Sequence, residues 1–371
     1  MIQQQYHVRM IKSLADFRRS ATLWDDLWER SSCAIPVARS GLISQWVEQF
    51  ASDSRLVIPV VESGERFLAA LPLVKTFKAG IVSTGSNPSN AWTLCGQLLI
   101  DTGENADAIM DTLVSAFRQL PFSILWLDYI RFNDPEWILF KKSLNSLNIP
   151  SHWLQRYSTA IVPLTAPSQQ GEPSSRWNKK QVADIRRRLK KYYPPGEYRF
   201  EAFRSPDEIQ RLLPECFTLE NKGWKGNSGS ILHRGMDSFY LQQAVLLAGT
   251  GNLTVYTLRL RGELIAFQYC YVAKGHVFVQ KLSYDPDVRE YAPGQVLQLF
   301  INEELCNDDS MHSFDFVGEL MPYQKIWNPD ETPNGQIVLP LSTVVGKSFF
   351  FLYDTLMPVV RKLRYRKPSH E

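Results

Sequence analysis

The stretch of sequence that decides the fold is Tyr284-Asp285-Pro286-Asp287-Val288-Arg289-Glu290-Tyr291-Ala292-Pro293-Gly294-Gln295-Val296-Leu297. It follows an apolar run and leads into residues with helical periodicity, so it predicts a strand, a turn and then a helix over residues 295–305. Pro293 suits the first helical position, where a backbone N–H has no partner to lose. Because free amides at a helix start bind phosphate, the turn predicts an anion site.

Polar side chains follow this helix. Residues 312–317 alternate between polar and apolar and predict a strand that carries Asp315, with Tyr323, Lys325 and Trp327 shortly after it. Asp315 is either catalytic, or a structural residue that points to solvent or caps the next loop. Tyr323 and Trp327 are four residues apart, a spacing that places two side chains on one helical face and is more typical of a core.

Composition bounds the class of protein. The chain has 371 residues, 44% of them hydrophobic and 12% aromatic, which suffices for two domains with packed cores. A net charge of +3 does not indicate a nucleic-acid binder. The five cysteines form no C-x-x-C pair and the six histidines have no ligand spacing, so we expect reduced thiols, a cytoplasmic protein and no metal. No signal peptide and no apolar run of about 18 residues is evident.

Both halves of the chain alternate helices and strands. In the first half, we expect helices over residues 14–29, 42–50 and 106–120, and strands over 55–61, 67–77 and 123–130. In the second half, we expect helices over 206–223 and 236–248, and strands over 253–260, 263–272 and 276–283. Residues 64–70 and 125–129 resemble residues 262–267 and 313–316, which indicates a weak internal duplication.

A polar stretch rich in turn formers, residues 166–175, predicts a linker. The predicted domains are therefore residues 1–165, residues 176–345 with the anion site, and a C-terminal helix with a basic tail over 346–371. The second domain opens with a basic helix whose basic residues include Lys179, Lys180, Arg186, Arg187, Arg188, Lys190 and Lys191. Such a run is a solvated face or a platform for a polyanion.

The C-terminal region has two interpretations. Residues 349–360 are mostly apolar and are followed by a basic run, Arg361 to Lys367. A segment of this kind packs on the body of a protein as an ordinary helix, or it lies on an anionic membrane surface. We therefore expect a cytoplasmic protein, with peripheral contact at the inner face of the membrane as the alternative.

The sequence resembles a known group, the acetyltransferases of the GNAT superfamily described as cellulose-biosynthesis (CelD-like) proteins, which are relatives of the Fem-type peptidoglycan aminoacyltransferases. The segments that carry the resemblance are, in order, residues 179–191, 220–226, 292–294, 314–319 and 323–327. The resemblance implies an α/β fold of two tandem GNAT-like domains, each a mixed, mainly antiparallel sheet flanked by helices. It also implies acyl-CoA bound by the second domain and an acceptor in or near the groove between the domains.

The resemblance assigns the donor site to the deciding stretch. The superfamily signature for the pyrophosphate is Arg or Gln, two residues, Gly, one residue, and Gly or Ala. The match runs from Arg289 to Gly294 and departs by Ala292 in place of the first glycine, whose Cβ narrows the approach of a phosphate. The residues implied to hold acyl-CoA are Arg289, Ala292, Gly294 and Gln295.

Acyl transfer also needs a base for the acceptor and a proton for the leaving thiolate. The candidate bases are Glu220, Asp315 and Glu319, and Tyr323 is the acid by analogy with the superfamily. The residues expected to contact the acceptor are Trp224, Lys225, Glu319 and Lys325. Glu220, Trp224 and Lys225 line that acceptor groove or form a helix end with a packed tryptophan.

The leading prediction is an acyl-CoA-dependent N- or O-acyltransferase in polysaccharide biosynthesis, which acts on a sugar, a polysaccharide precursor or an amine. One alternative is a Fem-type transferase that takes its donor from aminoacyl-tRNA. A second alternative is a non-catalytic scaffold that keeps a double-GNAT fold for polysaccharide assembly.

Overall fold

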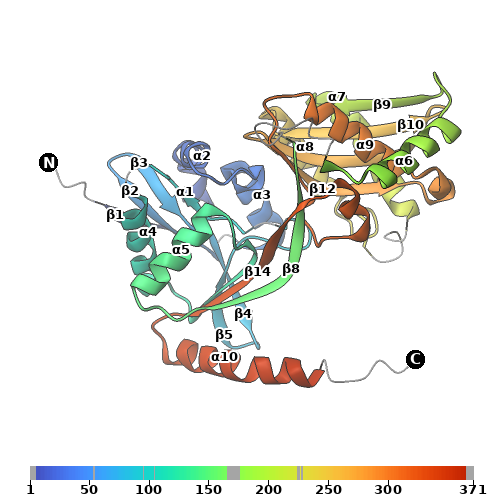
Figure 1. Cartoon of the computed structure of the whole chain (residues 1–371). Coiled ribbons are helices and arrows are strands. Elements are labelled where there is room, and N and C mark those ends of the chain that lie inside the picture. The colour runs from blue at the N-terminus through green and yellow to red at the C-terminus, as the bar shows by residue number, and fades with distance from the viewer. Residues whose placement is uncertain are drawn as a thin grey trace. The chain divides into compact units, whose positions relative to one another are not determined.

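A computed structural model describes residues 6–52, 55–94, 96–103, 105–164, 176–223, 226 and 229–364, with side chains up to residue 355. Within these residues the chain forms two compact units (Figure 1). Unit 1 contains residues 6–33, 37–157 and 333–364, and unit 2 contains residues 34–36 and 158–332. Each is a mixed, mostly antiparallel sheet flanked by helices, which confirms the predicted fold class. The predicted linker lies outside the described residues.

The bounds of the units differ from the predicted domains at the end of the chain. Strand β14 (Asp330–Pro340) leads back into unit 1, where Asn334 to Pro340 pair antiparallel with β7 (Ile124–Arg131). This ladder makes residues 333–345 part of unit 1, whereas the sequence assigned them to the second domain. Strand β8 (His152–Pro163) makes the opposite passage, from unit 1 into unit 2.

The sheet of unit 1 has the order β6-β3-β2-β4-β5-β7-β14, and β1 also pairs with β2. Its remaining strands are β1 (His7–Ile11), β2 (Leu56–Ser63), β3 (Arg66–Ala70), β4 (Leu73–Lys78), β5 (Val82–Ser86) and β6 (Leu99–Ile100). Its helices are α1 (Leu14–Arg19), α2 (Ala21–Arg30), α3 (Ser40–Phe50), α4 (Ala106–Ser115), α5 (Pro135–Ser146) and α10 (Val344–Arg364). The pair β5 and β7 is parallel.

The predicted elements of unit 1 differ from the observed ones where a local residue interrupts them. The predicted helix over 14–29 is two helices, because Ser20 leaves helical geometry and its hydroxyl donates to the Asp16 carbonyl. The predicted strand over 67–77 is two strands, β3 and β4, separated by Leu71 and Pro72, and proline cannot donate to a sheet ladder.

The sheet of unit 2 has the order β8-β13-β12-β11-β10-β9. Its strands after β8 are β9 (Tyr198–Phe203), β10 (Leu253–Leu260), β11 (Glu263–Ala273), β12 (His276–Tyr284) and β13 (Ser313–Asp315). Its helical segments are α6 (Lys179–Tyr192), α7 (Pro206–Lys222), α8 (Asp237–Gly249), η6 (Pro286–Tyr291), α9 (Pro293–Cys306) and η7 (Pro322–Trp327).

Alternation along β11 shows which helices cover each face of this sheet. Tyr271 donates to Gln243 of α8 at 2.9 Å, whereas Gln268 donates to Gln298 of α9 at 2.9 Å. Residues an odd number apart on a strand point to opposite faces, so α8 and α9 lie on opposite sides. Helix α7 packs on α8, and α6 packs on α9.

The sheet of unit 2 opens next to its only described parallel strand pair. Strands β12 and β13 pair from His276 with Ser313 to Phe278 with Asp315, where β13 ends. Strand β12 continues along β11 to Tyr284, with a register shift that leaves Gln280 as an extra residue. A bulge of this kind bends a strand and is common next to active sites. The end of β12 therefore stands apart from β13.

Candidate functional site

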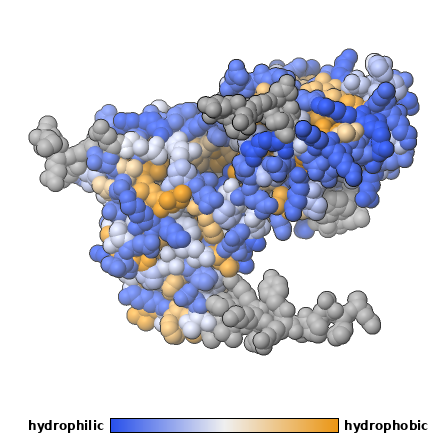
Figure 2. Space-filling view, in the orientation of Figure 1, coloured by the Kyte–Doolittle hydropathy of each residue, from blue (hydrophilic) through white to orange (hydrophobic). Residues whose placement is uncertain are grey.

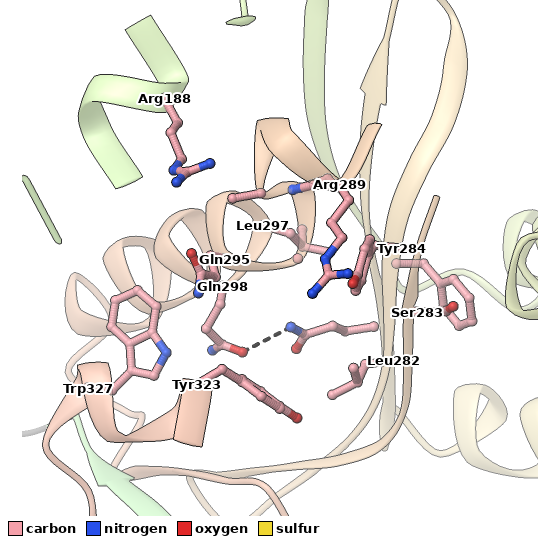
Figure 3. A pocket seen from close by; sticks show the side chains of 15 residues that line it. Arg188, Leu282, Ser283, Tyr284, Arg289, Gln295, Leu297, Gln298, Tyr323 and Trp327 are labelled. Atoms are coloured by element: carbon pink, nitrogen blue, oxygen red, sulfur yellow. Dashed lines mark hydrogen bonds between the residues drawn. The ribbon is translucent and has the colours of Figure 1, made fainter. Parts of the chain in front are cut away.

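A cavity of about 460 Å³ lies in unit 2 beside this opening (Figure 3). Its walls come from the start of α9, the first half of β11, the end of β12, and η7, which follows β13. Arg188 of the basic helix α6 also lines it. The cavity thus lies where the sequence predicted an anion site.

The start of α9 leaves one backbone amide for a ligand. Ala292 is the N-cap and has a left-handed conformation, with φ 53° and ψ 48°. The amides of Gln295 and Val296 both donate to the Ala292 carbonyl at 3.0 Å, and Pro293 has no amide hydrogen. No hydrogen bond within the described part of the chain uses the Gly294 amide. The predicted set of free amides is therefore a single N–H, that of Gly294.

Two arginine side chains from different elements lie near the start of α9. Figure 3 shows the guanidinium groups of Arg188 and Arg289 turned towards the cavity from either side of the start of α9. Arg188 donates to the Glu290 carbonyl at 2.6 Å and to Asp184 at 3.0 Å. The ring of Tyr192 stacks on Tyr291 with centroids 4.4 Å apart. These contacts hold the basic helix α6 against the turn before α9. The positive charge of Arg188 therefore lies at the cavity.

A chain of buried amide side chains forms the wall behind the helix start. Gln268 donates to Gln298 at 2.9 Å, and Gln298 donates to Asn302 at 2.8 Å (Figure 3 shows the first bond). All three residues are at most 4% exposed. Because a buried amide costs free energy unless it is paired, this chain fixes the orientation of each side chain and holds α9 on β11.

Tyr323 and Trp327 both line the cavity but differ in burial. Trp327 is 1% exposed and packs edge-on against Trp177, with centroids 5.3 Å apart. Tyr323 is 38% exposed, and burial of its hydroxyl raises the pKa of the phenol above its usual value. The hydroxyl therefore keeps its proton at neutral pH. Of the two, Trp327 belongs to the core, as its spacing indicated, and Tyr323 offers a proton to the cavity.

Two of the predicted bases have structural partners. Glu220 is fully buried at the end of α7, and one of its carboxylate oxygens accepts from the Ile231 amide at 2.8 Å. Asp315 is 1% exposed and accepts from the Val317 amide at 2.6 Å. This bond supports the left-handed conformation of Val317, φ 59°, so Asp315 caps the loop after β13 and does not point to solvent. Neither carboxylate lines the cavity.

The other predicted acceptor residues lie apart from the cavity or outside the described chain. Glu319 and Lys325 are exposed and do not line it. Trp224 and Lys225 are outside the described residues. The cavity therefore brings together five of the predicted site residues, which are Arg289, Ala292, Gly294, Gln295 and Tyr323.

The sequence did not single out Arg188, Gln268 or Gln298. Nothing local distinguishes Arg188 from Arg186 and Arg187, which pair with Glu303 and Asp184. A signal existed for the two glutamines, since each is an uncharged polar residue inside an apolar run that predicts a buried element.

The described residues hold no group of three or more His, Cys, Asp or Glu side chains that could bind a metal ion. A search for membrane spans among the described helices found none with the required length and apolar character.

Comparisons with known proteins bear on the class of this site. Residues 179–325 match the family model of the acetyltransferase (GNAT) domain. No curated protein matches the chain. The solved structures that share its fold include the following three. FemX has a TM-score of 0.58 and 9% identity, with 91% of this chain and 98% of that chain covered.

The other two are described as lysylphosphatidylglycerol synthetases. The C-terminal domain of a putative one from Agrobacterium fabrum has a TM-score of 0.53 and 14% identity, with 92% of this chain and 98% of that chain covered. L-PGS from Bacillus licheniformis has a TM-score of 0.52 and 13% identity, with 90% and 95% covered. At these identities the likeness concerns the fold.

The matched residues lie within unit 2 and include α6, the cavity turn and most of η7. Unit 2 therefore carries a GNAT acetyltransferase domain, and the chain is an acyltransferase. The CelD-like group within the superfamily stays a prediction.

Proposed function

We propose that the chain transfers an acyl group from acyl-CoA, bound in the cavity of unit 2, to a nitrogen or oxygen of a sugar, a polysaccharide precursor or an amine. The observation that carries the donor assignment is the meeting of Arg188, Arg289 and the unused Gly294 amide at one helix start. A diphosphate is the anion that best fits two guanidinium groups beside the positive end of a helix dipole.

The reaction needs little beyond position and proton transfer. The acceptor attacks the thioester carbonyl, the C–S bond breaks, the acceptor loses a proton and the coenzyme A thiolate gains one. We assign the second proton to Tyr323, whose raised pKa keeps the hydroxyl protonated. The acceptor proton goes to one of Glu220, Asp315 and Glu319, of which Glu319 has the solvent-exposed side chain.

Calorimetry with acetyl-CoA and longer acyl-CoAs tests the donor. The change Arg289→Ala removes a charge-assisted contact of about 1.5–3 kcal/mol, so we expect affinity to fall by roughly 10–100-fold. The matched control is Arg186→Ala, because Arg186 pairs with Glu303 and does not line the cavity. Absence of acyl-CoA binding by the unaltered chain would refute the donor assignment.

A second candidate donor is aminoacyl-tRNA. The observation in its favour is that Lys179, Lys180 and Lys190 are exposed on the same helix that carries Arg188 to the cavity. Basic side chains of this kind bind polyanions in a salt-dependent way. Retention of charged tRNA at low salt, lost when the three lysines are changed to alanine, would favour this donor, provided that acyl-CoA affinity stays unchanged.

We also propose a cytoplasmic role in polysaccharide biosynthesis, which rests on the resemblance to the CelD-like group alone. A screen of acyl transfer to sugar, nucleotide-sugar and amine acceptors, with coenzyme A release as the readout, tests it. Turnover with simple amines and none with any sugar would contradict the role in polysaccharide biosynthesis.

A further inference from the structure

Unit 1 carries an apolar surface remote in sequence from the cavity. The exposed large hydrophobic residues at the turn between β4 and β5 are Phe77 and Ile81, which are 54% and 81% exposed. On α10, Val344, Val345, Phe351 and Leu352 are between 52% and 81% exposed. Because α10 packs on β5, the two groups lie on one part of unit 1. We name these six residues the apolar face.

Helix α10 packs on the body of unit 1 with the side opposite the apolar face, so the apolar face stays exposed. A Cβ on Gly346 would overlap the Ser123 carbonyl oxygen, which shows how closely the helix backbone approaches the body. Tyr353 is 7% exposed, donates to Gln336 at 3.2 Å and packs edge-on against Trp126. Figure 2 shows hydrophobic residues on the surface over the first turns of α10.

The helix combines two chemistries. Val344, Phe351 and Leu352 are seven and eight residues apart, a spacing that puts them on one side of a helix. The sequence from 342 to the end contains six basic residues, Lys347, Arg361, Lys362, Arg364, Arg366 and Lys367, and two acidic ones, Asp354 and Glu371. Asp354 pairs with His152 at 2.7 Å. The segment is therefore both apolar and strongly basic.

We propose that the apolar face of unit 1 docks on an anionic lipid bilayer, with α10 lying along the surface. Side chains of an interfacial helix enter the boundary between headgroups and acyl chains, and basic residues add attraction to anionic lipid. A second copy of the chain is a poorer occupant, because pairing this segment with itself would bring like charges together. This inference goes beyond the proposed reaction and does not depend on it.

Flotation of the full chain with vesicles tests the proposal. We expect binding to vesicles of phosphatidylcholine with phosphatidylglycerol, weak binding to phosphatidylcholine alone, and release by salt. The double change Phe351→Ser and Leu352→Ser should weaken binding by about tenfold or more, since each exposed side chain loses the apolar area that it would bury. The matched control is Val245→Ser with Leu246→Ser on α8, two residues that are 40% and 38% exposed.

Each remaining outcome counts against the proposal. Equal binding to both kinds of vesicle, no binding by the unaltered chain, or unchanged binding by the Phe351 and Leu352 variant would overturn it. A concentration-dependent dimer in sedimentation velocity that the same variant abolishes would assign the face to a second copy instead. Thermal unfolding and acyl-CoA affinity should be unchanged in the variant, so failure here leaves the proposed function intact.

Discussion

The two units build the same arrangement, and in unit 2 the cavity lies beside the helix start that this arrangement provides. In unit 1 the parallel strands β5 and β7 flank the chain that carries α4, and in unit 2 the parallel strands β12 and β13 flank the chain that carries α9. Both helices begin at a left-handed residue, Asn105 with φ 70° and Ala292 with φ 53°. The shared geometry agrees with the internal duplication that the sequence indicated.

The charges at the two helix starts differ. The first turn of α4 contains Asp107, which pairs with Lys142 of α5 at 2.7 Å, so the positive end of this helix already has an anion. The first turn of α9 has no acidic residue, and Arg188 and Arg289 stand beside it. A helix N-terminus whose positive partial charge is already balanced by a carboxylate of the protein attracts a phosphate only weakly. The same backbone therefore serves stability in one unit and binding in the other.

The gaps beside the two parallel pairs differ as well. In unit 1 the Asn87 side chain spans from the end of β5 to β7, where it donates to the Asp128 carbonyl at 3.0 Å and accepts from the Asp128 amide at 2.9 Å. In unit 2 the pairing of β12 with β13 ends at Phe278 and Asp315, the bulge at Gln280 follows on β12, and the cavity lies beside this point. The Asn87 side chain thus continues the contact between the parallel strands in unit 1, whereas in unit 2 the extra residue Gln280 follows the last paired residues.

The largest effect is expected when the charge of α4 is transferred to α9. Gly294 occupies the helix position that Asp107 occupies in α4, and a Cβ there would meet the Tyr284 ring at an ordinary 3.6 Å. Two like charges about 5 Å apart repel by about 3 kcal/mol at the dielectric of a protein surface, so Gly294→Asp should weaken acyl-CoA binding by roughly 100-fold. Calorimetry measures this, and Gly294→Asn is the isosteric control. Equal losses in both variants would show that shape, not charge, distinguishes the helix starts.

A comparable effect on turnover is expected from the two tyrosines with raised pKa values. Burial raises the pKa of Tyr323 in unit 2 and of Tyr129 in unit 1, where the Asp128 charge adds to the effect. Loss of a general acid costs about 100-fold or more in kcat. We therefore expect Tyr323→Phe to lower kcat by about that factor with acyl-CoA affinity unchanged, and Tyr129→Phe to leave both unchanged.

The pH dependence follows from the same shift. Folding favours the protonated phenol of Tyr323, so its contribution to stability is complete below the unfolded pKa of about 10 and is lost as pH rises through the higher folded value. The alkaline limb of the kcat profile of the unaltered enzyme should therefore lie in this range. A Tyr323→Phe variant that keeps the same alkaline fall would exclude the hydroxyl as the proton donor.

A smaller effect, confined to unit 1, is expected from opening its gap. Asn87→Ala removes both bonds to Asp128 and leaves two partly buried backbone groups without these partners, at a cost of about 2 kcal/mol in unfolding free energy. Hydrogen exchange should show the loss in β5 and β7, with acyl-CoA affinity in unit 2 unchanged. Asn90→Ala is the control, because the Asn90 side chain accepts from the Trp92 amide within its own turn, and we expect about 0.5 kcal/mol. A gain of acyl-CoA binding in unit 1 would show that the gap between the parallel strands, and not the charge at the helix start, determines whether a unit binds the donor.

How much of this was predictable depends on how far the signal extends along the chain. The strand β10 was predicted with the bounds observed, Leu253–Leu260, because alternation and the Arg261-Gly262 turn are local. The cavity turn was predicted for the same reason, because its sequence signal, Arg289 to Gly294, is contained within six consecutive residues. Arg188 reaches the same turn from about a hundred residues away, and no local pattern marks it.

Other misses come from residues whose role depends on a distant partner. Strand β14 contains Pro333 and the Asn334-Gly335 pair, which is typical of a turn. Gly335 is there because a Cβ would overlap the Leu154 carbonyl oxygen of β8. Glu220 and Asp315 stay candidate bases, but their bonds to the Ile231 and Val317 amides were not foreseen, because a carboxylate that bonds a backbone amide looks the same in sequence as one that moves a proton.

The smallest effect is expected at the left-handed residues that begin α4 and α9. It tests most directly whether the two helix starts differ in backbone strain. An alanine in this conformation is strained by about 1–2 kcal/mol, and the extra freedom of glycine in the unfolded chain takes back about 0.5–1 kcal/mol. Ala292→Gly should therefore stabilise unit 2 by about 0.5 kcal/mol. Asn105→Gly should destabilise unit 1 by about 0.3 kcal/mol, because asparagine tolerates the left-handed conformation and glycine has the greater freedom in the unfolded chain.

Hydrogen exchange of the amides in α9 and α4 measures the two changes separately. Opposite signs would mean that unit 2 accepts strain at the helix start that unit 1 avoids, as backbone strain gathers at functional sites. The change Ala292→Gly also removes the Cβ close to the free Gly294 amide, so acyl-CoA affinity should stay equal or rise. A loss of both stability and affinity would mean that the Ala292 methyl group packs productively against the turn, and the strain would then have no functional meaning.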